Sequence, residues 1–318
     1  MRRTFRVAKK GRTPIVLRKM LAMLRAPTIV RSNDLEVVHR STMQRLVQQL
    51  DLSDYNYAAG FGVDAVTRED LRCVMNGFEA PPHKAVSWCS ALLVSRGVDD
   101  ECSIEECDSK WLSDIALWCT PVDDCPHLCA AVGVTAGGVD LKIELMPRQH
   151  GGYDVAAESA GGSYPEPDSR EAFTMAAVRA TNEEKYFTPA AFEWRRGVVG
   201  PEQGRGGAGA AALPWRGPLC LEVTYPLDEL DRAVQARDDA IEMWLGWKAA
   251  ASPLQHVQAT RVYKRDTALR KAYNAFNEKS FCKEFGYILG QSLAAAHAGP
   301  EDMAKHSQLG QDSGGGID

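Results

Sequence analysis

Three cysteines and a histidine lie close together near the middle of the chain: Cys119, Cys125, His127 and Cys129. Thiolates and imidazoles are common ligands of Zn²⁺, and residues 125, 127 and 129 would share one face of a strand. Structural zinc sites, however, usually contain two cysteines separated by two to four residues, and this segment has no such pair. It therefore indicates either a zinc-binding module or a group of buried free thiols.

A second candidate for chemistry is the segment 139–146, in which charged and apolar residues alternate. Asp140, Lys142 and Glu144 are each separated by one apolar residue, as in a strand with one polar face. A carboxyl group on such a face can act as a proton donor when it lies beside a substrate. The alternative is a pair of ordinary strand acids that face water.

Basic side chains gather near the C-terminal end of the chain, with Asp266 as the one acid among them. They are Arg261, Lys264, Arg265, Arg270 and Lys271. Guanidinium and ammonium groups pair with carboxylates, so this cluster could hold an acidic ligand or an acidic protein. A solvated helix face is the alternative interpretation.

Motifs of several common enzyme classes are absent. The sequence has no G-x-S-x-G elbow, no H-E-x-x-H and no phosphate-binding P-loop. A G-x-G-x-x-G pattern at 204–209 lies in a Gly- and Ala-rich stretch with Pro214 close behind, which is typical of a loop rather than of a dinucleotide site. A Ser-His-Asp arrangement built from distant parts of the chain stays open.

Charge is distributed unevenly along the chain. The net charge is −5, yet residues 1–33 contain ten Lys and Arg and no acid, which leaves 27 basic against 42 acidic residues in the rest. A basic, acid-free leader predicts a transit peptide for a plastid or, as the alternative, a mitochondrion. The other interpretation is a basic arm that binds RNA or a membrane surface. The acidic remainder argues against a nucleic-acid-binding domain, and no apolar run is long enough to predict a membrane span.

The elements that would position these groups follow from periodicity and turn residues. Apolar spacing predicts helices at 34–50, 64–76, 171–180, 227–249 and 264–297, the last with a break near Asn277. Short apolar runs predict strands at 85–93, 111–119, 128–135, 139–146, 193–199 and 219–224. The glycines at 137 and 138 predict a hairpin between two of these strands.

Consecutive strands followed by helices predict an α+β protein, a three-layer α/β/α sandwich with a central antiparallel sheet. We expect one such domain at 34–297, with a Gly-rich insertion at 200–217. Residues 298–318 form a polar, Gly-rich tail that we expect to be disordered.

Three segments, in this order, resemble the family of ferredoxin-dependent bilin reductases and red chlorophyll catabolite reductase. The segment 126–147 is similar to the family's strand–turn–strand pair, and 186–195 to its aromatic-Ser-Pro-x-x-Phe-x-Arg segment. The third is the long helix containing 237–245, followed by 261–290, where Phe285 and Gly286 match a Phe-Gly of the family.

This resemblance implies that a linear tetrapyrrole binds between the sheet and the C-terminal helices. It implies reduction by single electrons from reduced ferredoxin, with protons from protein acids and no bound metal or flavin, in the plastid and in chlorophyll catabolism. The substrate-binding candidates are Tyr186 and Trp194 for ring packing, Arg195, Arg270 and Lys271 for the propionates, and Asn274 for the lactam groups.

The sequence departs from the family at its two proton donors. The sheet acid of the family falls on Ala131, and the acid of the loop before Phe-Gly falls on Ala275. Glu144, on the neighbouring strand, is our candidate for the replacement donor. The alternative is a non-catalytic carrier or chaperone that binds the pigment and has lost the donors.

Overall fold

The computed structural model describes the following parts of the chain: 32–55, 66–68, 71–80, 86–96, 110–135, 137–146, 148, 185–186, 188–200 and 219–299. Most of the predicted leader and of the Gly-rich insertion lie outside these residues, as do the helix predicted at 171–180 and nearly all of the tail.

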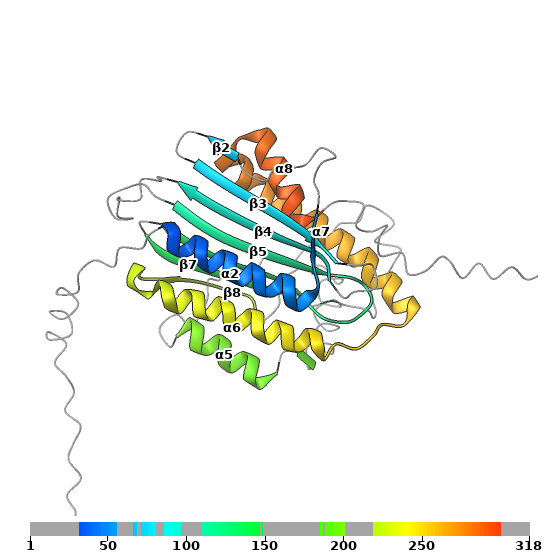
Figure 1. Cartoon of the computed structure of the whole chain (residues 1–318). Helices are drawn as coiled ribbons and strands as arrows, with labels where there is room; N and C mark the ends of the chain where they lie inside the picture. The colour runs from blue at the N-terminus through cyan, green and yellow to red at the C-terminus, as the bar shows by residue number, and fades with distance from the viewer. Residues whose placement is uncertain are drawn as a thin grey trace, which may run out of the picture.

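Eight strands form one antiparallel sheet (Figure 1). They are β1 (Ser53–Asp54), β2 (Val66–Arg68), β3 (Leu71–Glu79), β4 (Val86–Arg96), β5 (Lys110–Cys119), β6 (His127–Thr135), β7 (Gly138–Met146) and β8 (Leu221–Tyr225). The order across the sheet is β1-β3-β4-β5-β6-β7-β8, and β2 also pairs with β3. Strands β3 to β7 are therefore neighbours both in the chain and in the sheet.

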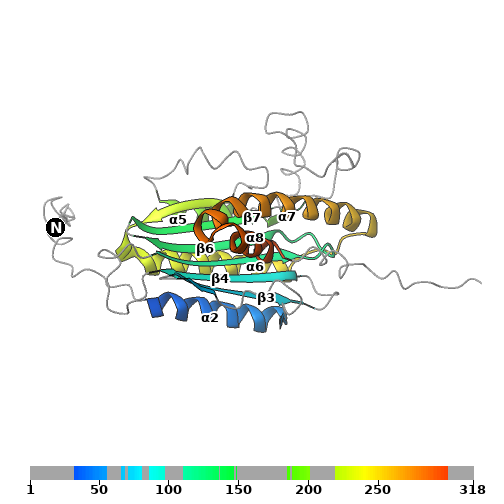
Figure 2. The same ribbon diagram turned by 90° about the horizontal axis from the view of Figure 1, so that it is seen from above.

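Helices cover both sides of this sheet. Helices α2 (Ser32–Leu50), α5 (Pro189–Val199) and α6 (Leu230–Ala249) pack against one face, and α6 follows a short 3-10 turn, η2 (Leu227–Glu229). The last two helices, α7 (His256–Phe285) and α8 (Tyr287–Ala298), pack against the other. Figure 2 shows α2 on one side of the strands and α7 on the opposite side. The predicted three-layer α/β/α sandwich is confirmed.

Each face of the sheet has its own hydrophobic core. Ile115 of β5 packs toward Trp244 of α6, whereas Trp118 of the same strand packs toward Leu293 of α8. Because successive strand residues point to opposite faces, a strand buried on both sides is apolar at nearly every position. The layer containing α2, α5 and α6 is called the α6 side below, and that containing α7 and α8 the α7 side.

The predicted β6–β7 hairpin is formed. Thr135 pairs with Gly138, whose φ of 139° is reached easily only by glycine. A Cβ at this position would lie 2.5 Å from the carbonyl oxygen of Tyr225. Gly138 thus permits both the turn and the close approach of β8.

Two predicted elements are wrong. The helix expected at 64–76 is the strand pair β2 and β3, and the strand expected at 193–199 is helix α5. The start of α5 explains the second error, since the Thr188 side chain accepts from the Ala191 amide and Pro189 occupies the first turn, a strong helix-start signal. The break in the last helix falls at Gly286, not near Asn277.

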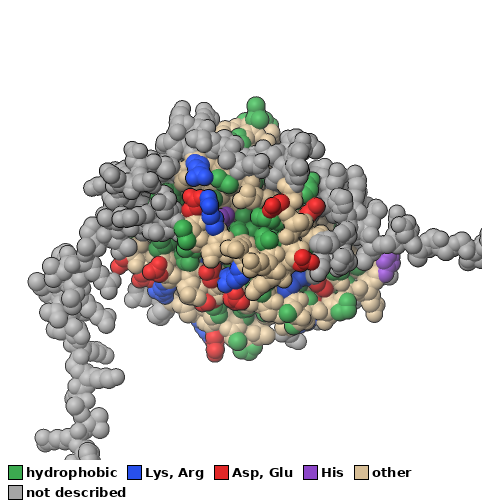
Figure 3. All heavy atoms as spheres, viewed as in Figure 1, with side chains coloured by type: hydrophobic (Ala, Val, Ile, Leu, Met, Phe, Trp, Pro, Cys, Tyr) green, Lys and Arg blue, Asp and Glu red, His purple; other side chains and the backbone are tan. Residues whose placement is uncertain are grey.

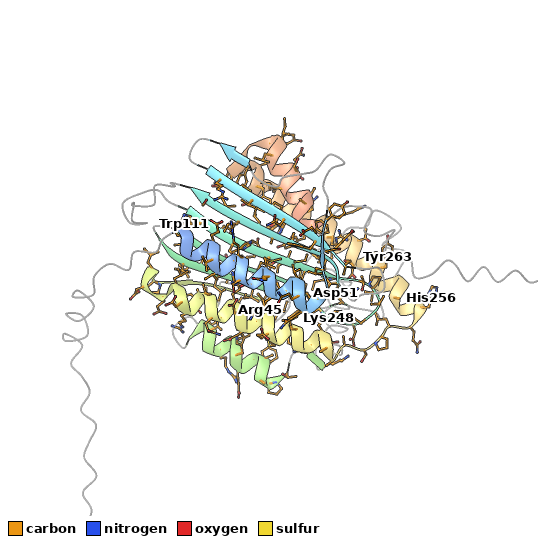
Figure 4. The ribbon with its side chains drawn as sticks, in the orientation of Figure 1. Arg45, Asp51, Trp111, Lys248, His256 and Tyr263 are labelled. Carbon is orange, nitrogen blue, oxygen red and sulfur yellow. The ribbon has the colours of Figure 1, made fainter. Side chains whose placement is uncertain are left out.

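Helices α2 and α6 lie side by side and are joined by ion pairs. Arg45 lies 2.8 Å from Glu242 and 3.9 Å from Asp238, and Figure 4 shows it between the two helices. Acidic and basic side chains are interspersed over this face (Figure 3). No helix of the described residues is long and apolar enough to cross a membrane.

Candidate functional site

The centre of the sheet presents a row of three unlike side chains toward the α7 side. Asp114 of β5 pairs in register with Ala131 of β6, and Ala131 pairs with Lys142 of β7. Ala131, the position expected from the family resemblance to be acidic, is thus a small residue between a carboxylate and an ammonium group. Strand β6 therefore lacks the expected acid, but Asp114 on the neighbouring strand β5 supplies a carboxyl group beside the same position.

Asp114 forms a buried pair with His297, near the end of α8. Asp114 Oδ2 lies 3.3 Å from Nε2 of His297, whose side chain is completely buried. The other ring nitrogen, Nδ1, lies 2.9 Å from the hydroxyl oxygen of Ser90 on β4. The imidazole of His297 thus lies between a carboxyl group and a hydroxyl group.

The electrostatics of the pair favour an ionised carboxyl group at Asp114. Burial alone would raise the pKa of Asp114, but the charge and hydrogen bond of His297 and the charge of Lys142 hold it below its usual value. Asp114 is therefore a carboxylate that faces Nε2 of His297. In the sheet, this carboxylate lies beside the small side chain of Ala131.

Three side chains fix the end of α8 and hence the position of His297. Trp88 Nε1 donates to the carbonyl of Ala296 at 3.0 Å, and Trp118 Nε1 donates to that of His297 at 3.2 Å. Arg270 Nε donates to the carbonyl of Ala298 at 2.7 Å. The last carbonyl groups of a helix have no partner within the helix, so these bonds both satisfy them and anchor the pair.

A second group of polar side chains lies on β6, β7 and α7. Glu144 is buried, with Oε1 3.3 Å from Nζ of Lys142, and it pairs in register with Cys129. Tyr273 of α7 hydrogen bonds to Cys129, and its pKa is raised well above the usual value by burial and by the nearby Cys129, Glu144 and Asp114. The predicted polar face of β7 is therefore directed at α7.

The structure separates the seven predicted site residues into two groups. Glu144, Arg270, Lys271 and Asn274 belong to the α7 side of the sheet or to α7 itself. Asn274 has a buried Oδ1 with no hydrogen-bond partner among the residues that the structure describes, and Lys271 is exposed. Arg270 lies over the ring of Trp118 at 5.9 Å in addition to its bond to Ala298, so its side chain holds the fold together.

Tyr186, Trp194 and Arg195 lie with the helices of the α6 side. Tyr186 packs against Trp247 of α6 at 5.6 Å between ring centroids and donates to Asp124, and Trp194 of α5 packs against the core of that side. The sheet stands between these residues and Glu144, so one ligand cannot contact both groups. The prediction of one site containing all seven residues needs this correction.

The four residues Cys119, Cys125, His127 and Cys129, for which the sequence left open a zinc-binding module or buried free thiols, do not converge on one site. Cys119 and Cys125 belong to the core of the α6 side, whereas Cys129 belongs to that of the α7 side. His127 accepts from the amide of Cys119 through Nδ1 and lies 3.1 Å from Asp266 through Nε2. Among the described residues, no group of three or more His, Cys, Asp and Glu could hold a metal ion.

Ser90, His297 and Asp114 are the residue types of a hydrolytic triad, but their arrangement excludes that use. The Ser90 hydroxyl donates to the carbonyl of His297 at 3.0 Å, so its oxygen is not available to a substrate carbonyl.

The architecture, an antiparallel sheet between two helical layers, resembles that of a protein of known structure. One solved structure illustrates the likeness: phytochromobilin synthase from tomato, crystallised in complex with biliverdin. It matches with 14% sequence identity and a TM-score of 0.59 over 86% of this chain and 84% of that chain. No family model matches the sequence, and no curated protein does. The likeness is therefore one of fold.

Proposed function

We propose that this chain binds a linear tetrapyrrole, a bilin or a red chlorophyll catabolite, on the α7 side of the sheet and reduces it. The single observation that carries the proposal is the buried Asp114–His297 pair next to Ala131. It brings a carboxylate and an imidazole together on the sheet face that is opposed by the C-terminal helices. The biliverdin complex of the tomato enzyme with the same fold supports the choice of ligand class.

The role of His297 follows from the chemistry of stepwise reduction. A linear tetrapyrrole that accepts an electron becomes more basic and takes up a proton, so each electron must be matched by one proton. His297 donates the proton from Nε2, and the carboxylate of Asp114 stabilises the imidazole and orients it. Ala131 leaves room for a pigment ring beside this pair because its side chain is a single methyl group.

Other residues of the α7 side would position the pigment. Lys142 can pair with a propionate, since its ammonium group lies at the partly exposed end of the row and 5.8 Å from the Phe276 ring. The buried Oδ1 of Asn274 can accept from a pyrrole or lactam N–H. Glu144 remains our candidate for a second proton donor, as it adjoins Lys142 on the same face.

Electrons would come from reduced ferredoxin, with no cofactor bound to the chain itself. Exposed Lys271, Lys279 and Lys283 on α7 offer positive charge to an acidic electron carrier. We place the protein in the plastid, on the basis of the basic leader and the need for ferredoxin.

A non-catalytic pigment carrier is the second candidate function. The observation in its favour is the absence of an acid at Ala131 and Ala275, which leaves proton delivery to residues on other elements. The two functions differ in turnover and not in binding.

Absorbance titration of the full chain with biliverdin and with red chlorophyll catabolite tests binding, and anaerobic addition of reduced ferredoxin then tests turnover. We expect saturable binding followed by loss of the pigment's long-wavelength band in the native protein. Binding without turnover would assign the carrier function. Absence of binding to either pigment would refute both.

A further inference from the structure

Asp266 of α7 forms an ion pair with Arg148, which lies just after β7. The two side chains meet as a fork: Nη2 of Arg148 contacts Oδ2 of Asp266, and Nε lies 3.4 Å from Oδ1. The side chain of Arg148 is completely buried, and that of Asp266 is 12% exposed. Asp266, the one acid among the basic residues near the C-terminal end, is therefore directed into the protein and not into water.

The carboxylate of Asp266 has a second partner at the first residue of β6. His127 Nδ1 accepts from the amide of Cys119 at 3.0 Å, so the ring proton is on Nε2. This nitrogen lies 3.1 Å from Oδ1 of Asp266. Burial opposes ionisation of Asp266, but the charge of Arg148 holds its pKa below the usual value. The carboxylate thus lies between a guanidinium group and an imidazole of the sheet.

Arg148 also joins this carboxylate to the loop between β5 and β6. Its Nη1 donates to the carbonyl of Thr120 at 2.6 Å and to that of Asp123 at 3.0 Å. The donors of a guanidinium group lie in a rigid planar fork, so bonds to a helix on one side and to a loop on the other fix the distance between them. Directional bonds, and not apolar contacts alone, therefore hold this part of α7 on the sheet.

The residues of α7 nearest to the proposed pigment site follow Asp266 on the same helix. Tyr273 is seven residues further along and Asn274 eight, which is two turns and about 10–12 Å along the helix axis. Tyr273 is buried on the α7 side, where its ring packs edge-on against Trp118 at 5.3 Å between centroids. Because backbone hydrogen bonds join each turn to the next, a shift of the helix at Asp266 is carried to both residues.

We propose that Asp266 is a positioning residue for the pigment site, with Arg148 and His127 as its partners. The three side chains fix α7 over the sheet at the place where Tyr273 and Asn274 meet the pigment. Their contribution is to position more than to stability, since apolar residues of similar size are often as stable as a buried ion pair. This inference rests on the proposed binding of a linear tetrapyrrole on the α7 side.

The test is the visible circular dichroism of biliverdin bound to the full chain, which reports the geometry of the bound pigment and needs no turnover. The double variant Arg148→Met/Asp266→Leu removes both charges together, so neither is left buried without its partner. We expect its urea unfolding midpoint to be retained, and the circular dichroism band of the saturated pigment to be weaker than in the native protein. Reduction by reduced ferredoxin should slow by up to about 10²-fold, because the pigment is misplaced.

The control is Arg45→Met/Glu242→Leu, which removes an ion pair between α2 and α6 on the other side of the sheet. This variant should bind biliverdin with the native spectrum. A native spectrum in Arg148→Met/Asp266→Leu, with or without a loss of stability, would overturn the positioning role alone. Absence of biliverdin binding to the native chain would overturn the proposed function and this role together.

A second comparison keeps the proposal testable if the double variant does not fold. Asp266→Asn keeps the size of the side chain and removes its charge. Glu278→Gln makes the same change at another acid of α7, which accepts from Gln291 of α8 at 2.8 Å. We expect a weaker circular dichroism band in Asp266→Asn and the native band in Glu278→Gln. Equal bands in the two variants would contradict the assigned role of Asp266.

Discussion

Two histidines contact opposite faces of strand β5, and they differ in the charge of the group that faces the imidazole. His39 of α2 contacts Ser113 at 2.7 Å on the α6 side, and His297 of α8 contacts the next residue, Asp114, at 3.3 Å on the α7 side. Both imidazoles are buried. Their neighbours differ, because His39 faces a guanidinium group and His297 a carboxylate.

The difference decides which histidine can hold a proton. Burial and the charge of Arg237 lower the pKa of His39 to about 4, so His39 is neutral at pH 7 and serves to pack α2. His297 instead faces the Asp114 carboxyl group, whose pKa is held below its usual value by the charge and hydrogen bond of His297. Burial is common to both sites, and the sign of the neighbouring charge separates a structural histidine from a candidate proton donor.

The largest expected effect is on turnover when the charge of Asp114 is removed. Asp114→Asn keeps the shape of the side chain but no longer stabilises a proton on His297, so we expect reduction of the pigment to slow by about 10²–10⁴-fold. Pigment affinity should change little. Anaerobic single-turnover absorbance with reduced ferredoxin measures the rate, and Asp140→Asn, an exposed acid on the same face of β7, is the control.

The second prediction concerns stability against pH on the other face. The folded-state pKa of His39, about 4, lies below its ordinary value of 6.5. As the pH falls from 6.5 to 4, the His39 imidazole is therefore protonated in the unfolded chain but stays neutral in the folded chain. We expect this to cost about 3 kcal/mol of the free energy of unfolding by pH 4.

Urea unfolding at several pH values checks this prediction, with His39→Gln as the comparison. The variant should lose less stability than the native protein between pH 6.5 and 4. Parallel pH profiles for the two proteins would show that His39 is not the responsible group.

A smaller effect is expected at the anchor of α8. Trp88→Phe keeps an aromatic ring in the core but removes the hydrogen bond to Ala296. We expect the free energy of unfolding to fall by about 0.5–1.5 kcal/mol because one hydrogen bond is lost, while the Ala296 carbonyl keeps its bond from the Gly299 amide at 3.2 Å. We also expect slower turnover, since His297 is the next residue; an unchanged unfolding midpoint in urea would contradict the anchoring role.

The smallest effect is expected between α2 and α6. Arg45 is about one-third exposed and pairs with Glu242 at 2.8 Å. Because ion pairs in contact with water contribute little, Arg45→Gln should lower the free energy of unfolding by only about 0–1 kcal/mol. Thermal unfolding at low and high salt measures it, and a large loss would show that α2 depends on this pair more than on its core contacts.

Much of the fold could be predicted from the sequence because its signals are local. The segments 85–93, 111–119, 128–135 and 139–146 each correspond to a strand of the sheet. The errors at 64–76 and 193–199 have a local cause as well. Cys73 and Met75 are both buried and lie two residues apart, which is strand spacing that the helix prediction overlooked. The capping residues at the start of α5 favour a helix despite the apolar content of its sequence.

The candidate site could be predicted less well from the sequence, because its residues come from distant parts of the chain. Asp114 is a lone acid in an apolar strand, and His297 is the only basic residue in the last turn of α8. Neither forms a motif, and only the sheet register places Asp114 beside Ala131. A lone acid inside an apolar strand was the one signal available, since a buried charge requires a partner.

The most direct test of the account is an absorbance titration of Ala131→Leu with biliverdin. A leucine at this position fills the space beside Asp114 and His297, so we predict loss of pigment affinity by at least about tenfold, on the order of 1.4 kcal/mol, with the fold retained by circular dichroism. Glu222→Leu, on the same face at the edge strand β8, should bind as the native protein does. Native affinity in Ala131→Leu would contradict a pigment site on this face of the sheet.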